Sequence, residues 1–223
     1  MSNEAMTWFW NFISNSVYGL QAIDALWGTY CILMIYMRLG QKRFRSPRKQ
    51  DEFLDQLEQP LGAGDLDGAM AMVEGDRRAL PQLATLAIAN RNVEFTRIQE
   101  LLVERFQKDV IVDLENKISW INNVNKTAPM LGLLGTVLGM MAAFGKLYAA
   151  GDKGISPSEL AGDISFALIT TAIGLAITLP CTIAVGHINI KLKALEESVT
   201  SGLNRFLESF APAQKAYLSR GRR

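Results

Sequence analysis

Three stretches of the chain are apolar enough to cross a membrane. Residues 127–145 and 164–186 contain no Asp, Glu, Lys or Arg, and a membrane-spanning helix needs roughly 20 mostly apolar residues. Residues 17–37 contain Gln21 and Asp24 but are uninterruptedly apolar from Ala25 to Met37. The pattern predicts an all-α integral membrane protein with three transmembrane helices, at 17–37, 127–148 and 163–190.

The helical pattern continues beyond the second and third spans. From Pro81 the chain has no further proline until Pro129, and its apolar residues recur every three or four positions, which is typical of an amphipathic helix. We expect one long helix from Pro81 into the second span, and a third helix that continues until Pro212. Glycines and prolines before residue 82 predict short helices broken by turns. No useful length alternates with the period of two that a strand requires.

Basic residues are distributed very unevenly between the segments. Residues 38–126 hold 14 Lys and Arg, residues 191–223 hold 7, and only Lys146 and Lys153 lie between the second and third spans. By the positive-inside rule, 38–126 is a cytoplasmic helical domain, 191–223 is a cytoplasmic C-terminal helix and tail, and 149–162 is a periplasmic loop. Residues 1–16 contain no Lys or Arg, which argues against a signal peptide and places the N-terminus in the periplasm.

Aromatic and basic residues flank the first span. Ahead of it, residues 1–16 carry four aromatic residues and are expected to form an interfacial N-terminal segment at the lipid headgroups; these residues are Trp8, Phe9, Trp10 and Phe12. Behind it, six basic residues between Arg38 and Lys49 either meet membrane lipid headgroups in general or form a specific site for an anionic lipid. The general contact is the favoured interpretation.

Composition excludes several classes of protein. With 23 Lys and Arg against 22 Asp and Glu the net charge is +1, so bulk charge gives no reason to expect nucleic-acid binding. Cys31 and Cys181 both lie in apolar segments and His187 is the one histidine, so we expect no disulfide, metal site or cofactor. The spans lack paired carboxylates and a Ser/His pair, and we expect no enzyme activity.

Small residues form a face of the second span. Gly132, Thr136 and Gly139 are spaced so that they share one side of a helix with Gly135 beside them, and such a face lets another backbone approach closely. Close packing is the favoured role of the glycines. For Thr136 two interpretations remain open, because its hydroxyl either serves a function or bonds its own backbone at i−4.

The third span carries a second stripe of small and hydroxyl-bearing residues. Thr171, Gly174, Thr178 and Thr182 recur at intervals of three or four, which suits a polar lumen or a tight interhelical contact better than lipid. Pro180 interrupts the backbone ladder of this span, so we expect a kink there.

Two acidic residues lie near the spans. Asp163 stands at the predicted non-cytoplasmic mouth of the third span, where an ion could enter. Asp24 lies about two turns inside the first span, counted from its non-cytoplasmic start at 3.6 residues per turn. A structural, hydrogen-bonded acid is the favoured interpretation of Asp24, and a residue through which an ion enters is the alternative.

The two long apolar segments resemble a known family. Ala128-Pro-Met-Leu-Gly-Leu-Leu-Gly-Thr-Val-Leu-Gly-Met140 and Ile164-Ser-Phe-Ala-Leu-Ile-Thr-Thr-Ala-Ile-Gly-Leu-Ala-Ile-Thr-Leu-Pro180 are similar to the second-span and third-span signatures of the MotA/TolQ/ExbB proton-channel family. The order of the spans, the chain length and the predicted topology resemble the ExbB/TolQ branch.

The resemblance implies a function and a set of partners. It implies a homo-oligomer, a pentamer, in the bacterial inner membrane around the transmembrane helices of a single-span, ExbD- or TolR-like dimer. A partner aspartate would carry the ion, and Thr136 and Thr171 of this chain would face it, with Thr178 further along the path. The chain would then be the larger subunit of an ion-driven motor for work in the cell envelope.

One residue departs from the family pattern and keeps alternatives open. Phe166 stands where the enterobacterial ExbB pattern has an acidic residue, so this chain has no mid-span carboxylate in its third helix. Either the partner alone carries the titrating group, or the ion is not a proton. A proton is favoured over sodium as the transported ion, and a membrane scaffold without ion conduction is the alternative function.

Overall fold

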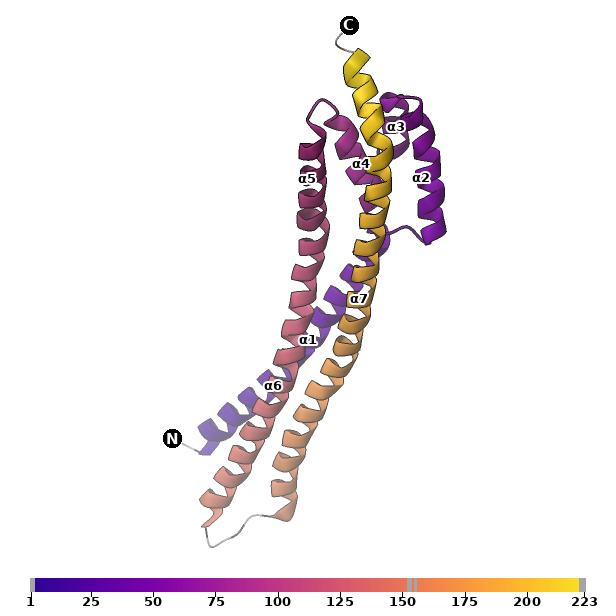
Figure 1. The fold of residues 1–223 in the computed structure, drawn as a ribbon. Helices are drawn as coiled ribbons and strands as arrows, with labels where there is room; N and C mark the ends of the chain where they lie inside the picture. The colour runs from indigo at the N-terminus through magenta and orange to yellow at the C-terminus, as the bar shows by residue number, and fades with distance from the viewer. Residues whose placement is uncertain (1–2, 152–153, 155, 221–223) are drawn as a thin grey trace. The chain divides into compact units, whose positions relative to one another are not determined.

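Long helices dominate the protein. The computed structural model describes residues 3–151, 154 and 156–220, and within these ranges it contains helices and no strand. Three long helices are α1 (Asn3–Lys42), α6 (Val112–Ala150) and α7 (Pro157–Arg220) (Figure 1). Between α1 and α6 lie α2 (Pro47–Gly62), α3 (Leu66–Val73), α4 (Ala79–Ala89), α5 (Phe95–Phe106) and the π-helical turn η1 (Gln107–Ile111).

Three helices in the described part of the chain are long and apolar enough to cross a membrane, and they contain the three predicted spans. The prediction of an all-α membrane protein, with the second and third spans extended as long helices, is confirmed. The short helices α2, α3 and α4 agree with the breaks that the glycines and prolines before residue 82 predict. Gly64 and Gly75, at the ends of α2 and α3, adopt positive φ angles of 71° and 82°, which cost glycine little.

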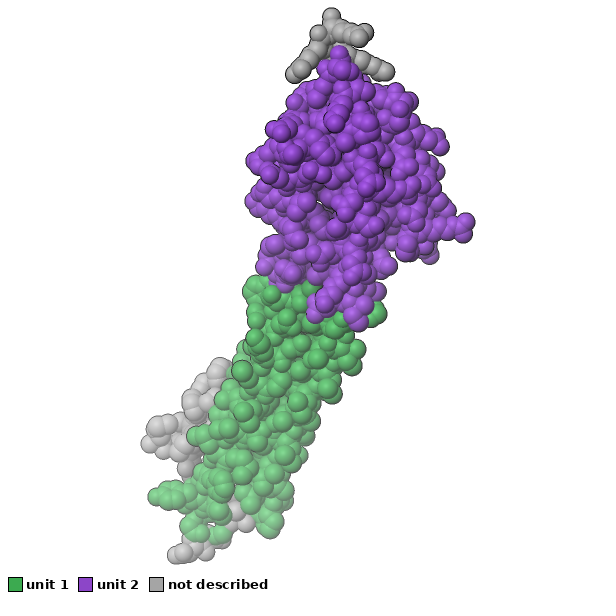
Figure 2. Space-filling model, in the orientation of Figure 1, with its two compact units in different colours: residues 1–33, 118–187 green, residues 34–117, 188–223 purple. Residues whose placement is uncertain are grey.

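Two compact units divide the long helices between them (Figure 2). The first unit, residues 1–33 and 118–187, contains most of the apolar stretches of α1, α6 and α7. The second unit, residues 34–117 and 188–223, contains α2–α5 and the remaining parts of the long helices. Its core is made of large side chains that are almost fully buried, among them Phe206, Phe210, Leu57, Leu61, Leu80, Ile88, Ile98 and Leu102.

The prediction of one helix from Pro81 into the second span is wrong. Pro81 does lie in the first turn of α4, but that helix ends at Ala89, and the chain turns before α5 begins at Phe95. Gln214 of α7 stabilises the turn, because its Nε2 donates to the carbonyl oxygens of Arg91 at 2.8 Å and Val93 at 2.7 Å. A contact 121 residues away in sequence therefore stabilises the turn, which local periodicity could not reveal.

Helices α1 and α7 are longer than predicted. The backbone of α1 is helical from Asn3 to Lys42, with no break at residue 16; the aromatic side chains predicted at the membrane interface, those of Trp8, Phe9, Trp10 and Phe12, lie outside the described side chains. Helix α7 continues through Pro212 to Arg220. Neither Pro212 nor the predicted boundary at residue 16 ends a helix.

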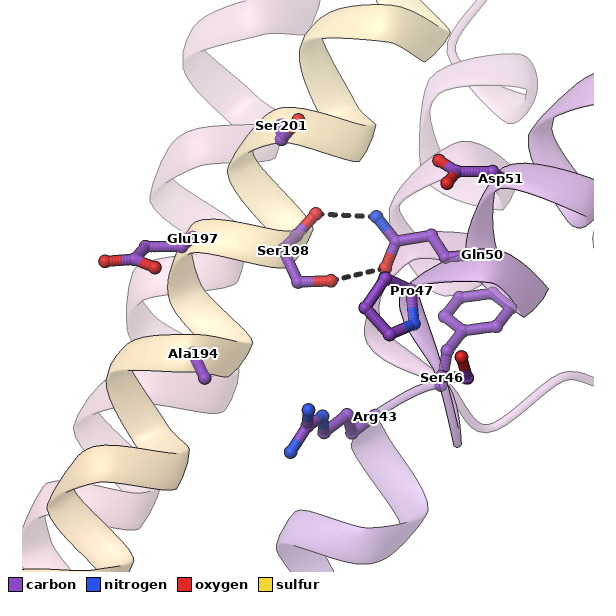
Figure 3. Close-up of a pocket in the computed structure, with 10 residues that line it drawn as sticks. Arg43, Ser46, Pro47, Gln50, Asp51, Ala194, Glu197, Ser198 and Ser201 are labelled. Atoms are coloured by element: carbon purple, nitrogen blue, oxygen red, sulfur yellow. Dashed lines mark hydrogen bonds between the residues drawn. The ribbon is translucent and has the colours of Figure 1, made fainter.

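A pair of hydrogen bonds joins α2 to α7 within the second unit (Figure 3). The chain leaves α1 through Ser46, whose backbone is extended, and Pro47 then begins α2. Gln50 Nε2 donates to the Ser198 carbonyl at 2.7 Å, and the Ser198 hydroxyl donates to Gln50 Oε1 at 2.6 Å. Gly202, one turn further, leaves room for this amide, because a Cβ there would lie 2.6 Å from Gln50 Nε2.

Candidate functional site

Glycines bring α6 and α7 into close contact along a line that we call the α6–α7 seam. A Cβ at Gly132 would lie 2.9 Å from Cα of Thr171, and one at Gly139 would lie 2.7 Å from Cβ of Ala167. A Cβ at Gly174 would lie 2.5 Å from the Ala128 carbonyl oxygen. Side chains at these positions cannot fit, so the predicted small face of the second span packs against the third span of the same chain.

Gly135 contacts a threonine that the sequence interpretation did not single out. A Cβ at Gly135 would collide with the Thr170 side chain, which is fully buried. The Thr170 hydroxyl donates to the Ala167 carbonyl at 2.9 Å. Thr170 is therefore a packing residue of the seam, although its sequence neighbour Thr171 belonged to the predicted hydroxyl stripe.

Thr136 and Thr171 lie together at the seam, and their hydroxyls are within hydrogen-bond distance of each other. The Thr136 hydroxyl also reaches the carbonyl oxygens of Gly132 and Ala167, both at 3.2 Å. The Thr171 hydroxyl reaches the same two oxygens at 3.0 Å and 3.4 Å. The structure thus brings together two residues that are 35 apart in sequence, and we call them the threonine pair.

The threonine pair can bind further groups. Each hydroxyl has one proton to donate and two lone pairs to accept with, while the carbonyl oxygens around it can only accept. Both side chains are only partly buried. The pair therefore retains acceptor lone pairs for a cation, a water molecule or a protonated carboxyl group, and a rotated hydroxyl can donate to a carboxylate.

Gln21 of α1 fixes the other side of α7. This side chain is 1 % exposed, and its Nε2 donates to the Thr170 carbonyl oxygen at 2.7 Å. Successive residues of an α-helix are about 100° apart around the axis, so Thr171 points away from the side of α7 that meets α1. The signal that could have identified Gln21 is a glutamine within an apolar segment.

Thr178 and Pro180 lie further along α7 than the threonine pair, toward the C-terminal end of that helix. The Thr178 hydroxyl donates to the Gly174 carbonyl of its own helix at 2.9 Å. Thr178 lies two turns from Thr171 on the same stripe and is partly buried, so its role in an ion path stays a prediction. Pro180 is exposed, and α7 continues past it.

Two acidic residues of neighbouring helices lie beside opposite ends of the second span. Asp163 pairs with Lys146 at 2.8 Å, near the C-terminal end of that span. Asp24 accepts a hydrogen bond of 2.7 Å from the Thr127 hydroxyl, at the N-terminal end of that span. The structure therefore brings neither acid to the threonine pair. It also places Asp24 beside the end of the second span that is remote from the 149–162 loop.

Phe166 fills the position that is acidic in the enterobacterial ExbB pattern. Its ring meets the Tyr18 ring of α1 edge-on, with 5.3 Å between the centroids. The α7 sequence then has no Asp or Glu between Asp163 and Glu196. No group of three His, Cys, Asp or Glu residues that could hold a metal ion occurs among the residues that the structure describes.

The sequence of this chain is similar to those of known proteins. Residues 77–201 match the MotA/TolQ/ExbB proton channel family. The chain is 34 % identical over 96 residues to the Tol-Pal system protein TolQ of Haemophilus influenzae, covering 43 % of this chain and 41 % of that protein. It is 32 % identical over 114 residues to the biopolymer transport protein ExbB of Aquifex aeolicus, covering 50 % of this chain and 75 % of that protein.

A third relative, the biopolymer transport protein exbB1 of Vibrio cholerae, is 49 % identical over 53 residues, which is 24 % of this chain and 23 % of that protein. The match to the family includes all of α6 and all of the α7 residues that form the seam. The relatives named TolQ and ExbB point to the branch that the two signatures resemble. The chain belongs to the MotA/TolQ/ExbB proton channel family, in its ExbB/TolQ branch.

Proposed function

We propose that this chain is the larger subunit of an ion-driven motor in the bacterial inner membrane, and that it couples the proton gradient to work in the cell envelope. The observation that carries the proposal is the threonine pair, which places two hydroxyls from different spans at one point of a membrane-spanning seam. Helix packing needs the glycines of the seam but does not need both hydroxyls at that point.

The partner supplies the charge in this proposal. Within the apolar parts of α6 and α7 the described chain has hydroxyls and carbonyls but no carboxylate, so it cannot carry protons alone. A single-span, ExbD- or TolR-like dimer would bring a carboxyl group to the threonine pair, whose hydroxyls can bond it in either protonation state. Each elementary charge that crosses is worth about 2.3 kcal/mol per 100 mV, so a few ions drive one mechanical step.

The assembly and the topology follow the same proposal. A homo-oligomer, a pentamer, surrounds the partner, and the apolar exposed residues of α6 and α7 are covered by neighbours or lipid; examples are Leu133, Val137, Leu168 and Leu175. The N-terminus and the 149–162 loop lie in the periplasm, and residues 38–126 and the C-terminus lie in the cytoplasm, because the basic residues gather there.

One observation favours a second candidate, a membrane scaffold without ion conduction. The hydroxyls of Thr136 and Thr171 both reach main-chain carbonyls of the seam. Hydrogen bonds of this kind stabilise a helix pair without any ion.

Valine substitution separates the two candidates. Thr136→Val and Thr171→Val keep the shape of the side chain and remove the hydroxyl, so a motor loses about tenfold or more of its ion flux if each hydroxyl contributes about 1.4 kcal/mol to the passing ion. The measurement is proton and sodium flux through the subunit and its partner, purified together and reconstituted in liposomes. Serine at either position should restore part of the flux.

A matched control tests whether hydroxyl loss matters anywhere in the membrane. Thr29 of α1 is exposed, and its hydroxyl donates at 2.8 Å to the Ala25 carbonyl of its own helix. Thr29→Val should leave flux and assembly unchanged. Full flux in both Thr136→Val and Thr171→Val, in normally assembled complexes, would favour the scaffold.

A further inference from the structure

The seam carries polar side chains beyond the threonine pair. Ala128 of α6 meets Gly174 of α7, since a Cβ at Gly174 would lie 2.5 Å from the Ala128 carbonyl oxygen. The two helices run antiparallel, because Gly139 meets Ala167 and Gly132 meets Thr171. One helical turn beyond the Ala128–Gly174 contact, the residues at the same level are Asn125 on α6 and Thr178 on α7.

Asn125 has an unusual environment for an amide. Its Oδ1 is buried and has no hydrogen-bond partner within the protein. Buried polar atoms in proteins are almost always paired with protein or water. This oxygen is therefore suited to accept a hydrogen bond from water or hydronium, or to bind a cation directly.

Asn125 lies on the same side of α6 as Thr136. The two residues are eleven positions apart, which is about three helical turns and about 16 Å along the axis. Helix α1 packs on another side of α6, where Asp24 accepts a hydrogen bond from Thr127 and Gly28 lies against Val124. Thr127 is two residues from Asn125 and so about 160° away from it around the helix. Asn125 therefore faces away from α1, as the threonine pair does.

The surrounding surface is polar on α6 and apolar on α1. At the level where α1 exposes Leu26, Trp27 and Tyr30, α6 exposes Asn122 and Lys126. Trp27 and Trp120 mark this level, with 6.0 Å between their ring centroids. Asn122 and Lys126 belong to the segment 38–126 that we place in the cytoplasm, so the polar α6 side at this level faces water.

We propose that Asn125, opposite Thr178, is a second ion-binding position on the path from the threonine pair toward the N-terminal end of α6. Its Oδ1 binds the permeating cation or the water that hydrates it. An amide does not titrate in the physiological range, so Asn125 guides the ion and the partner carries the proton. This inference rests on the proposed function, and it adds a residue that neither the small faces nor the threonine stripe identified.

The test measures flux through the complex of this subunit with its partner in liposomes, with a pH-sensitive dye or a sodium indicator inside. Asn125→Leu keeps the approximate volume and removes the amide, and we expect at least a tenfold loss of flux with normal assembly. Asn125→Asp keeps the acceptor and adds a titratable group. Flux should persist and should acquire a new dependence on the pH of the solution on the side of the membrane where the N-terminal end of α6 lies. A purely structural asparagine would not produce that pH dependence.

A matched control and a labelling measurement complete the test. Asn123 is exposed on α6, about 160° around the helix from Asn125, and Asn123→Leu should leave the flux unchanged. In a background with Cys31→Ala and Cys181→Ala, Asn125→Cys should react with a small cationic thiol reagent added from the α6 N-terminal side, while Leu26→Cys should not.

The outcomes are separable from those of the threonine substitutions. Full flux in Asn125→Leu, or an unreactive Asn125→Cys, overturns the second position even where Thr136→Val and Thr171→Val abolish flux. Loss of flux in Asn125→Leu, together with the new pH dependence of Asn125→Asp, supports it. The difference between the dye and the indicator shows whether the bound species is hydronium or sodium.

Discussion

The two compact units of this chain pack by opposite means. The first unit joins α6 to α7 through Gly132, Gly135, Gly139 and Gly174, where backbones nearly touch. The second unit buries large side chains such as Phe206 and Phe210, whose rings stack with 5.4 Å between centroids. In water, burial of apolar area gains about 25 cal/mol per Å², but lipid is as apolar as leucine, and helices there associate by close contact and hydrogen bonds.

This difference explains where polar groups occur in each unit. In the first unit the buried polar atoms lie where two helices touch, as with Gln21 and Thr170. In the other unit most charged pairs lie at the surface, for example Arg205 of α7 with Asp55 and Glu58 of α2. A small-residue seam leaves room for hydroxyls and amides, and that is where the candidate ion path lies.

The largest expected effect comes from adding volume to the seam. Gly135→Leu should prevent α6 from approaching α7, because even a Cβ there collides with Thr170. We expect loss of assembled protein in mild detergent, measured by size-exclusion chromatography. Gly145→Leu is the matched control, since a Cβ at Gly145 meets nothing within 4 Å. Equal behaviour of the two variants would contradict the close contact at Gly135.

Removing side-chain volume should disturb the second unit. Phe206→Ala removes a ring that is 1 % exposed and should destabilise this unit by about 3–5 kcal/mol. The measurement is resistance of the full-length protein in detergent to limited proteolysis, read at sites in α2 to α5. Leu218→Ala, at a side chain that is 39 % exposed, should change little. If both variants were cut at the same rate, the Phe206 ring would not be part of this core.

The smallest effect concerns a charged pair of the second unit. The Arg78 guanidinium and the Arg78 backbone N–H both donate hydrogen bonds to the Asp76 carboxylate. These bonds lower the pKa of Asp76 below its ordinary value, although burial acts in the opposite direction. A lowered pKa in the folded state stabilises the fold above the ordinary pKa near 4, and the gain is lost as pH falls through the folded-state pKa.

Asp76→Asn should therefore lower stability at pH 7 by at most about 1 kcal/mol, since solvent screens a partly exposed pair. Thermal unfolding of the full chain in detergent at pH 7 and pH 3 measures it. The gap between the variant and the parent protein should shrink at pH 3. A gap that grew on acidification would contradict the direction of the pKa shift. Glu74→Gln, at an exposed neighbour, is the control.

Much of the fold could be predicted from hydrophobic patterns. The three spans and the long helices follow from uncharged stretches of about 20 residues and from periodicity. The turn between α4 and α5 could not, because Gln214 stabilises it from the far end of the chain. Two members of the site, Thr136 and Thr171, came from the family signatures, whereas Gln21 and Asn125 have no motif around them. Thr170 lies inside the third-span signature, but only its contact with Gly135 identifies it as a packing residue.

By itself the sequence determined the class of the protein, its three spans and which residues share a face of each helix. The tertiary structure decided which faces meet: it set Thr170 against Gly135 and Thr171 against Thr136, and it placed Asp24 beside Thr127. Periodicity within a helix is local, but the rotation and register between helices are not. They depend on where glycines let two backbones come together, and only contacts between distant residues reveal that.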